Sequence, residues 1–196
     1  MKIIAATRNK GKLTELEAIL KDFDIRLISW DEAGLGDFEI EENGQSCEEN
    51  SYIKAKTICD MTGEAALADD TGLFVDALDG EPGINSARYA GEHGNDAANR
   101  KKLLKKLEGR PFEERTAKFV TVITVVYPDG NKLVARGECP GHITEKEIGD
   151  RGFGYDSIFV PEGHEETFAQ LPPEYKNSLS HRHFALVKLT ELLENR

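Results

Sequence analysis

The stretch KIIAATRNKGKLTELEAIL, residues 2–20, predicts the fold class of the chain. Its first part, KIIAAT, is a short apolar run typical of a buried strand, and a polar turn containing Gly11 follows it. From Lys12 onward leucines recur at helical spacing, which predicts an amphipathic helix that ends at about Asp22. A buried strand followed by such a helix is the repeating unit of α/β folds.

The rest of the chain continues this alternation and adds a hairpin. The capping box Ser46-x-x-Glu49 predicts a helix to about Met61, and the next apolar strand ends at Asp69-Asp70. We expect further strands at 25–30, 37–41, 117–127, 132–139 and 157–160, and helices at 73–78, 96–108, 144–149 and 180–193. The pattern predicts an α/β fold with a mixed central β-sheet flanked by helices. We expect one domain, 1–196, whose two lobes flank an active-site cleft.

Composition excludes several classes of protein. The 196 residues carry a formal net charge of −11, which argues against general binding to nucleic acid or to anionic membranes. The three cysteines show no C-x-x-C spacing, so neither a zinc site nor a disulfide framework is expected. The N-terminal apolar run is too short for a signal peptide, and the longest run, 119–127, is about half of a membrane span. We expect a cytoplasmic protein.

The turn TRNKGK, residues 7–12, carries three cationic side chains in an acidic chain. It lies between a strand and a helix, where free N–H groups and the positive end of the helix dipole attract phosphate. Thr7, Asn9, Lys10 and Lys12 are candidate phosphate ligands. The spacing differs from a Walker loop. The alternative is an ordinary turn with solvated lysines.

Two acidic clusters could hold a divalent cation. Six acidic residues and no basic one lie between Asp37 and Glu49. Mg²⁺ usually binds one or two carboxylates together with substrate phosphates, but a solvated acidic face is an equally ordinary interpretation. In ADDTG, Asp69 and Asp70 end an apolar strand, where α/β sheets place ligand groups. This pair suggests a metal ligand or a general base, and the alternative is a cap for the next turn.

Two later segments could bind a planar ring. GFGYD, residues 152–156, offers the aromatic faces of Phe153 and Tyr155 and an acceptor at Asp156. The alternative interpretation of this motif is a glycine-rich bend whose aromatic side chains belong to the core. Lys176 precedes Ser180-His181-Arg182, and Arg182 opposes the dipole at the start of the last helix. A charge in such a place needs a compensating group, and an oxygen-rich ligand is one.

Taken together, these motifs resemble one family. TRNKGK, EENG, ADDTG, PGINSARYAG, GFGYDSIF and K-x-x-x-SHR, in this order from residue 7 to residue 182, are similar to the motifs of the inosine triphosphate pyrophosphatase family. The chain departs from the family pattern at Thr71, where serine is common, and in the helix after ENG. The resemblance implies hydrolysis of noncanonical purine nucleoside triphosphates (ITP, dITP and XTP) to a monophosphate and pyrophosphate. It also implies a requirement for Mg²⁺ or Mn²⁺ and a homodimer.

The resemblance also implies a role for each motif. Thr7, Asn9, Lys10, Lys12 and Thr71 would bind the triphosphate. Glu41 and Asp70 would bind metal, and Asp70 would be the catalytic base. Glu42 is the close rival of Glu41, and Asp69 would support the metal ligands. Phe153, Gly154 and Tyr155 would hold the purine, and Asp156, Lys176, His181 and Arg182 would read its edges.

The expected base selectivity follows from hydrogen bonding. Hypoxanthine and xanthine present a 6-oxo acceptor that Arg182 and a donating His181 can satisfy, whereas adenine presents a donor. Leaving a buried donor unsatisfied costs about 1–3 kcal/mol, so ATP should be a poor substrate. Rejection of GTP must involve its 2-amino edge. Two other classes are a Maf-like pyrophosphatase with another base preference and a non-catalytic nucleotide sensor.

Overall fold

The strand, turn and helix expected at the start of the chain are present in the computed structural model, which describes residues 1–21, 23 and 25–195. Strand β1 spans Lys2–Ala5 and helix α1 spans Lys10–Leu20. Asn9 caps α1, because its side-chain oxygen accepts the N–H of Lys12 at 3.1 Å. The predicted end of this helix, Asp22, lies outside the described residues.

The other helices and strands follow in the order expected of a mixed α/β chain. They are β2 (Arg26–Ile28), α2 (Cys47–Thr62), β3 (Ala66–Val75), β4 (Pro82–Gly83), α3 (Asp96–Lys106), β5 (Thr116–Val126), β6 (Lys132–Ile143), β7 (Phe159–Pro161), α4 (Pro173–Leu179) and α5 (His181–Glu194). Short 3-10 turns occupy Asp76–Leu78, Ser86–Arg88, Phe112–Glu114 and Asp156–Ile158. None of the helices in the described part of the chain has the length and apolar character needed to cross a membrane.

The strands form one mixed sheet, as the sequence predicts. Their order is β2-β1-β3-β5-β6-β7, and β4 pairs with β3 off this path. β1 lies parallel to both β2 and β3, whereas the β3–β4 and β6–β7 pairs are antiparallel. The predicted hairpin turn joins β5 to β6, where the N–H of Tyr127 donates to the carbonyl of Asn131 at 2.9 Å.

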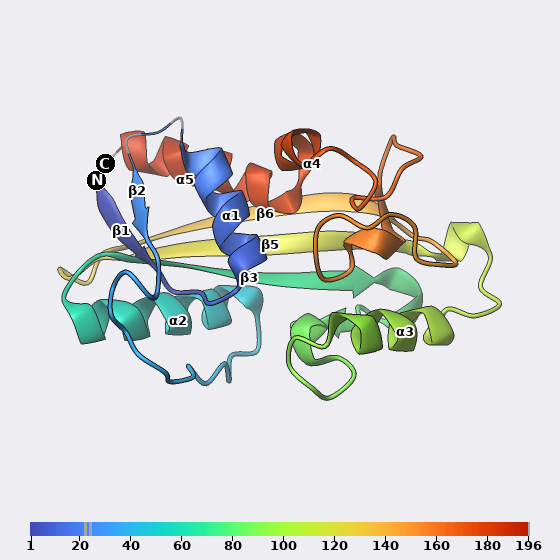
Figure 1. The fold of residues 1–196 in the computed structure, drawn as a ribbon, viewed down its shortest axis with the longest axis horizontal. Coiled ribbons are helices and arrows are strands. Elements are labelled where there is room, and N and C mark those ends of the chain that lie inside the picture. The colour runs from blue at the N-terminus through green and yellow to red at the C-terminus, as the bar shows by residue number, and fades with distance from the viewer. Residues whose placement is uncertain (22, 24, 196) are drawn as a thin grey trace. The chain divides into compact units, whose positions relative to one another are not determined.

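The chain divides into two compact units. Unit 1 comprises Met1–Asp70, Thr121–Gly137 and Arg182–Arg196, and unit 2 comprises Thr71–Val120 and Glu138–His181. In unit 1, α1 and α5 cover one face of the strands and α2 covers the other (Figure 1). Leu16, Leu186 and Leu189 fill the first interface, and Ala55 and Ile58 fill the second. That the whole chain acts as a single domain stays a prediction.

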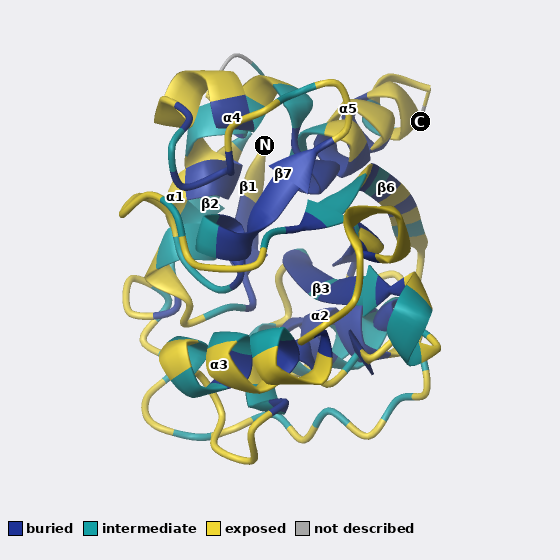
Figure 2. Cartoon of the chain, turned by 90° about the vertical axis from the view of Figure 1, so that its right-hand side faces the viewer, coloured by how far each residue is buried: buried dark blue, intermediate teal, exposed yellow. Residues whose placement is uncertain are grey.

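Unit 2 has its own core of aromatic and aliphatic side chains. Phe119, Phe159 and Phe168 pack against one another, with ring centroids 4.7 to 6.0 Å apart. Leu103 and Leu107 bring α3 and the residue that follows it to this core. Figure 2 shows buried and exposed residues alternating along α3, as expected of a helix that turns one side to a core, and shows β7 buried throughout.

Several expected elements differ in the structure, and one helix was not expected. Residues 37–41 alternate in exposure as predicted, but they form no strand ladder. The strand expected to end at Asp69-Asp70 continues to Val75, so both aspartates lie inside β3. The predicted helix at 73–78 is wrong over 73–75, where Leu73 and Phe74 pair with β4, and only a 3-10 turn follows at Asp76–Leu78. The predicted helix at 144–149 is also wrong, since the hydroxyl of Thr144 donates to the carbonyl of Lys146 instead of capping a helix. The sequence interpretation missed α4.

Candidate active site

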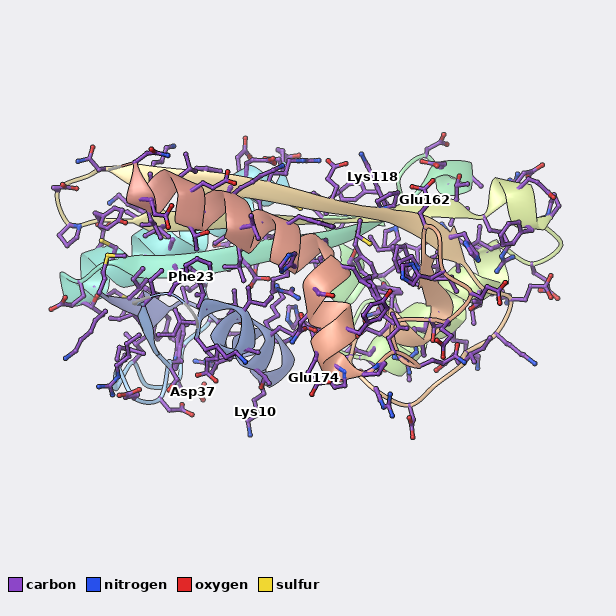
Figure 3. All side chains as sticks on the ribbon, turned by 90° about the horizontal axis from the view of Figure 1, so that it is seen from above. Lys10, Phe23, Asp37, Lys118, Glu162 and Glu174 are labelled. Carbon is purple, nitrogen blue, oxygen red and sulfur yellow. The ribbon has the colours of Figure 1, made fainter. Side chains whose placement is uncertain are left out.

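The turn between β1 and α1 is organised by its own polar side chains. The N–H of Asn9 donates to the hydroxyl oxygen of Thr7 at 3.2 Å, and Asn9 caps α1. Arg8 donates to the carboxylate of Asp37 at 2.8 Å and stacks over Trp30, so its charge is used within unit 1. Lys10 is exposed and points away from the ribbon (Figure 3). The turn thus offers helix N–H groups and an outward amine.

Lys12 points instead toward β3, where it meets Asp69. The ammonium nitrogen of Lys12 lies 3.1 Å from Oδ2 of Asp69. Arg182, at the second position of α5, donates to the same oxygen from Nη2 at 3.0 Å and pairs with Glu15 of α1 through Nη1. The side chains of Asp69 and Arg182 are almost fully buried. Unit 1 therefore contains a buried network of two cations and two carboxylates.

This network explains the charge of Arg182 without a ligand. Burial alone would raise the pKa of Asp69, but the charges of Lys12 and Arg182 hold that pKa well below its usual range. Burial would lower the pKa of Arg182, and Asp69 and Glu15 raise it instead. Arg182 is thus a fixed cation whose two carboxylate partners offset the unfavourable position at the helix start. Its role in reading the base stays a prediction.

Asp70 lies beside a different cation. Nζ of Lys54, from α2, donates to Oδ1 of Asp70 at 2.9 Å and lies 3.3 Å from Oε2 of Glu42. Burial raises the pKa of Asp70 above that of an ordinary aspartate, although Lys54 and Lys12 oppose the shift. Burial would lower the pKa of Lys54, but Asp70 and Glu42 raise it. Asp70 is therefore a stronger base than a surface carboxylate.

The second oxygen of Asp70 is available for a ligand. Oδ2 is buried, and no hydrogen-bond partner for it is present among the described residues apart from the weakly donating thiol of Cys47, which lies beside the carboxylate. The described part of the chain contains no ready-made cluster of three metal-ligating side chains. Two carboxylates with a free oxygen nevertheless fit Mg²⁺, which takes its other ligands from water and phosphates.

Of the two candidate glutamates, Glu42 is the one that shares an ion-pair partner, Lys54, with Asp70. Glu41 is exposed, whereas Glu42 is partly buried. The segment is held by Asn50 of α2, whose side-chain oxygen accepts the N–H of Gly44 at 2.9 Å. A Cβ at Gly44 would lie 2.7 Å from that oxygen, so only glycine allows this close approach. The approach of the loop to α2 therefore sets the position of Glu42.

In unit 2, the loop 152–156 is folded around Asp156. Oδ2 of Asp156 accepts the N–H of Phe153 at 3.0 Å and Nζ of Lys176 at 2.6 Å. A Cβ at Gly152 would lie 2.0 Å from the same oxygen, and the φ of Gly152 is +75°. Nζ of Lys176 lies 5.1 Å from the ring centroid of Phe153, which is partly exposed. The structure thus brings together three of the predicted base-binding residues.

Two other predicted base-binding residues are buried in unit 2. The ring of Tyr155 belongs to the core, and its hydroxyl donates to the carbonyl of Ser86 at 2.7 Å. His181 stacks on Phe119, with ring centroids 4.5 Å apart and planes 16° from parallel. Tyr155 is therefore an anchor for the loop more than an open stacking surface. Thr71, the first residue of unit 2, is partly exposed on β3.

The sequence and the fold of this chain match those of known proteins. A sequence profile described as the Ham1 family matches residues 3–192. The chain belongs to the Ham1 family. It is 45% identical over 192 residues to a protein of Oceanobacillus iheyensis named dITP/XTP pyrophosphatase, and the match covers 98% of both chains. A protein of the same name from Desulforamulus reducens is 47% identical over 197 residues, 98% of this chain and 96% of that one.

Solved structures confirm the fold of this Ham1 family member. The Ham1 protein of Staphylococcus aureus superposes with a TM-score of 0.86 at 40% identity, over 100% of this chain and 99% of that one. A HAM1 protein from Coxiella burnetii gives a TM-score of 0.88 at 38% identity, over 100% of both chains. The predicted fold class and family are confirmed.

Sequence reasoning missed two buried charges of the Ham1 chain. Lys54 lies on the buried side of α2, where it follows Cys47, Asn50 and Ser51 at helical spacing. A lysine on an otherwise buried helical stripe is rare unless it is paired with an acidic group, so this spacing could have indicated a buried ion pair. Glu15 is buried on α1 next to Leu16. Its partner is far along the chain, which the local pattern does not reveal.

Proposed function

We propose that this chain hydrolyses noncanonical purine nucleoside triphosphates, namely dITP, ITP and XTP, to the nucleoside monophosphate and pyrophosphate. Its family membership and its relatives named dITP/XTP pyrophosphatase support the reaction class. The single structural observation that carries the proposal is Asp70. It is a buried carboxylate with a raised pKa, which accepts a hydrogen bond from Lys54 at one oxygen and whose only other hydrogen-bond partner among the described residues is the weakly donating thiol of Cys47.

The triphosphate is assigned to the turn before α1. The first N–H groups of a helix and its positive dipole end attract phosphate oxygens. Lys10 supplies an exposed, outward charge, and Thr7 and Asn9 keep the turn in shape. Lys12 can turn one of its three N–H donors to phosphate while it stays close to Asp69. Thr71 is kept as a further hydroxyl contact to substrate.

The metal is assigned to Asp70 and Glu42. Both carboxylates meet Lys54, so they lie close enough to share a cation, whereas Glu41 is exposed. Bound Mg²⁺ or Mn²⁺ would neutralise charge on the phosphate oxygens and the leaving pyrophosphate. Lys54 adds a fixed positive charge at the same place and keeps the two carboxylates together before a nucleotide arrives.

Asp70 is assigned as the general base for the attacking water. A general base works best when its pKa lies near the operating pH, and burial raises the pKa of Asp70 toward neutral pH. Because Lys54 donates to Oδ1, the proton of the water would be accepted at Oδ2. The products are then a monophosphate and pyrophosphate, as the family resemblance implies.

The base is assigned to the loop 152–156 and its neighbours. Phe153 is the partly exposed ring, so it is the stacking surface, and Gly154 leaves room beside it. Lys176 and Asp156 form a buried donor and acceptor pair behind that ring. His181 lies buried against Phe119 and would donate to a 6-oxo group. Tyr155 anchors the loop through its hydroxyl, and Arg182 is proposed, from the family resemblance, to read the edge of the base.

The test is pyrophosphate release with Mg²⁺ from dITP, ITP, XTP, dGTP, ATP and dUTP, measured side by side. We expect the first three to be hydrolysed well, each leaving a monophosphate. Asp70→Asn should keep nucleotide binding and lose most turnover, because the amide cannot accept the proton. Asp60→Asn, which breaks an exposed pair with Lys56 on α2, is the matched control and should be fully active. Orthophosphate release, or full activity of Asp70→Asn, would contradict the proposal.

We further propose a homodimer located in the cytoplasm, both carried over from the family resemblance. Exposed apolar side chains on α5, including Phe184, Val187 and Leu192, are compatible with burial in an interface. Light scattering after size-exclusion chromatography tests the dimer, because a mass equal to one chain at micromolar concentration would contradict it.

A further inference from the structure

The residue at the tip of the loop 152–156 is held by α3 on both sides of its backbone. The N–H of Gly154 donates to Oδ2 of Asp96 at 2.8 Å. The carbonyl of Gly154 accepts Nη1 of Arg100 at 2.7 Å. Asp96 and Arg100 are four residues apart on α3, so their side chains project from the same side of the helix. One turn of a helix thus holds both polar groups of a single residue.

Arg100 is itself held in place. Its Nε donates to Oε2 of Glu147 at 2.9 Å, and the hydroxyl of Ser157 donates to the same oxygen at 3.3 Å. The guanidinium is a rigid fork, and its side chain is only 18% exposed. Two separate atoms of the fork are engaged, one with the loop and one with Glu147. Bonds to charged groups are about twice as strong as neutral ones, so this contact restrains the loop.

The held residue lies between the groups assigned to the base. Phe153 is the preceding residue, and Asp156 closes the turn by donating its N–H to the carbonyl of Phe153 at 3.1 Å. A displacement of the Gly154 peptide therefore moves the ring of Phe153 with respect to Lys176 and Asp156. Misplacement of a reacting group by about 1 Å can cost about 100-fold in rate, so small changes in this loop matter.

We propose that Asp96 and Arg100 are positioning residues that set base selectivity by holding the Gly154 peptide. The inference rests on the proposed function, because it takes the loop 152–156 as the surface that meets the purine. Neither side chain needs to touch substrate. Their effect is to keep the ring of Phe153 and the Asp156–Lys176 pair in one arrangement. The loop then cannot rearrange to satisfy a base that presents the wrong hydrogen-bonding edge.

The test compares kcat/KM for dITP and dATP in four variants of α3. Arg100→Met and Asp96→Ala remove the two contacts, and each should lower the dITP-to-dATP ratio by about tenfold, equal to about 1.4 kcal/mol. Asp96→Asn keeps an acceptor for the N–H of Gly154 and should restore the wild-type ratio. Leu104→Ala, which removes partly buried core contacts on the same helix, should lower the melting temperature and leave the ratio unchanged.

The outcomes separate this inference from the proposed function. If the wild-type protein releases no pyrophosphate from dITP, the proposed function fails and this inference fails with it. If the wild type is selective and Arg100→Met and Asp96→Ala keep its ratio, the function stands and the positioning role is overturned. A ratio that falls equally in Leu104→Ala would also overturn it, because general loosening of α3 would then explain the effect.

Discussion

Replacing Arg182 with methionine should destabilise the protein far more than replacing a surface arginine. The Arg182 side chain is 1% exposed, and it faces Asp69 and Glu15. Methionine keeps much of the volume and removes the charge. Asp69 would then keep its pair with Lys12 and the charge of Lys54, and Glu15 would lose the arginine that offsets its burial.

The expected loss of unfolding free energy follows from these contacts. Two unit charges about 4 Å apart interact by about 4 kcal/mol at an effective dielectric constant of about 20. Removing one partner of a buried ion pair typically costs about 3–5 kcal/mol, because the other charge stays buried without compensation. Since Lys12 still faces Asp69, we expect Arg182→Met to lose about 3–5 kcal/mol and not the sum for two pairs.

Urea unfolding followed by circular dichroism measures this loss. Arg136→Met is the matched control, because Arg136 forms an exposed ion pair with Glu48. The side chains of Arg136 and Glu48 are 44% and 43% exposed, and such pairs contribute about 0–1 kcal/mol to stability. Glu15→Gln should lie between the two. A loss below about 1 kcal/mol in Arg182→Met would refute the reasoning, since Asp69 and Glu15 would then have to be solvated.

Three further predictions concern acid stability, the base loop and the number of domains. The folded pKa of Asp69 lies below its unfolded value, so its ionisation stabilises the protein above the ordinary carboxyl pKa, and this contribution is lost as pH falls through the folded pKa. Arg182→Met raises that pKa, and ellipticity measured against pH should show acid unfolding at a higher pH than in the wild type. Gly152→Ala should cost at least about 1–2 kcal/mol and impair dITP hydrolysis, because its Cβ meets Asp156 and its φ is positive. Gly163→Ala, with a positive φ and open space, is the control and should keep full activity. Finally, the fluorescence of Trp30, the single tryptophan, and far-ultraviolet circular dichroism should report one unfolding transition, because β3, β5 and β6 each contribute residues to both units. Two separate midpoints would contradict a single domain.

Much of the fold was predictable because its signals are local. The leucine spacing of α1, the capping box of α2 and the turn between β5 and β6 each depend on residues a few positions apart. The wrong prediction at residues 73–75 depends on a partner strand. The sequence interpretation placed residues 73–75 in a helix, but they extend β3, because β4 pairs with Leu73 and Phe74. Propensity is a weak prior wherever such a partner exists.

The candidate site divides in the same way. The sequence by itself determined which residue types are present and in which motifs, and the motif order was enough to indicate the family. It also marked Arg182 as a charge in an unfavourable place. Only the tertiary structure decided what compensates that charge, because Asp69 and Glu15 lie 113 and 167 positions away along the chain. The same holds for the contacts of Lys54 with Asp70 and Glu42 and for the hydrogen bonds of α3 to Gly154. Coulomb and hydrogen-bond energies depend on distance in space, which local sequence spacing does not encode.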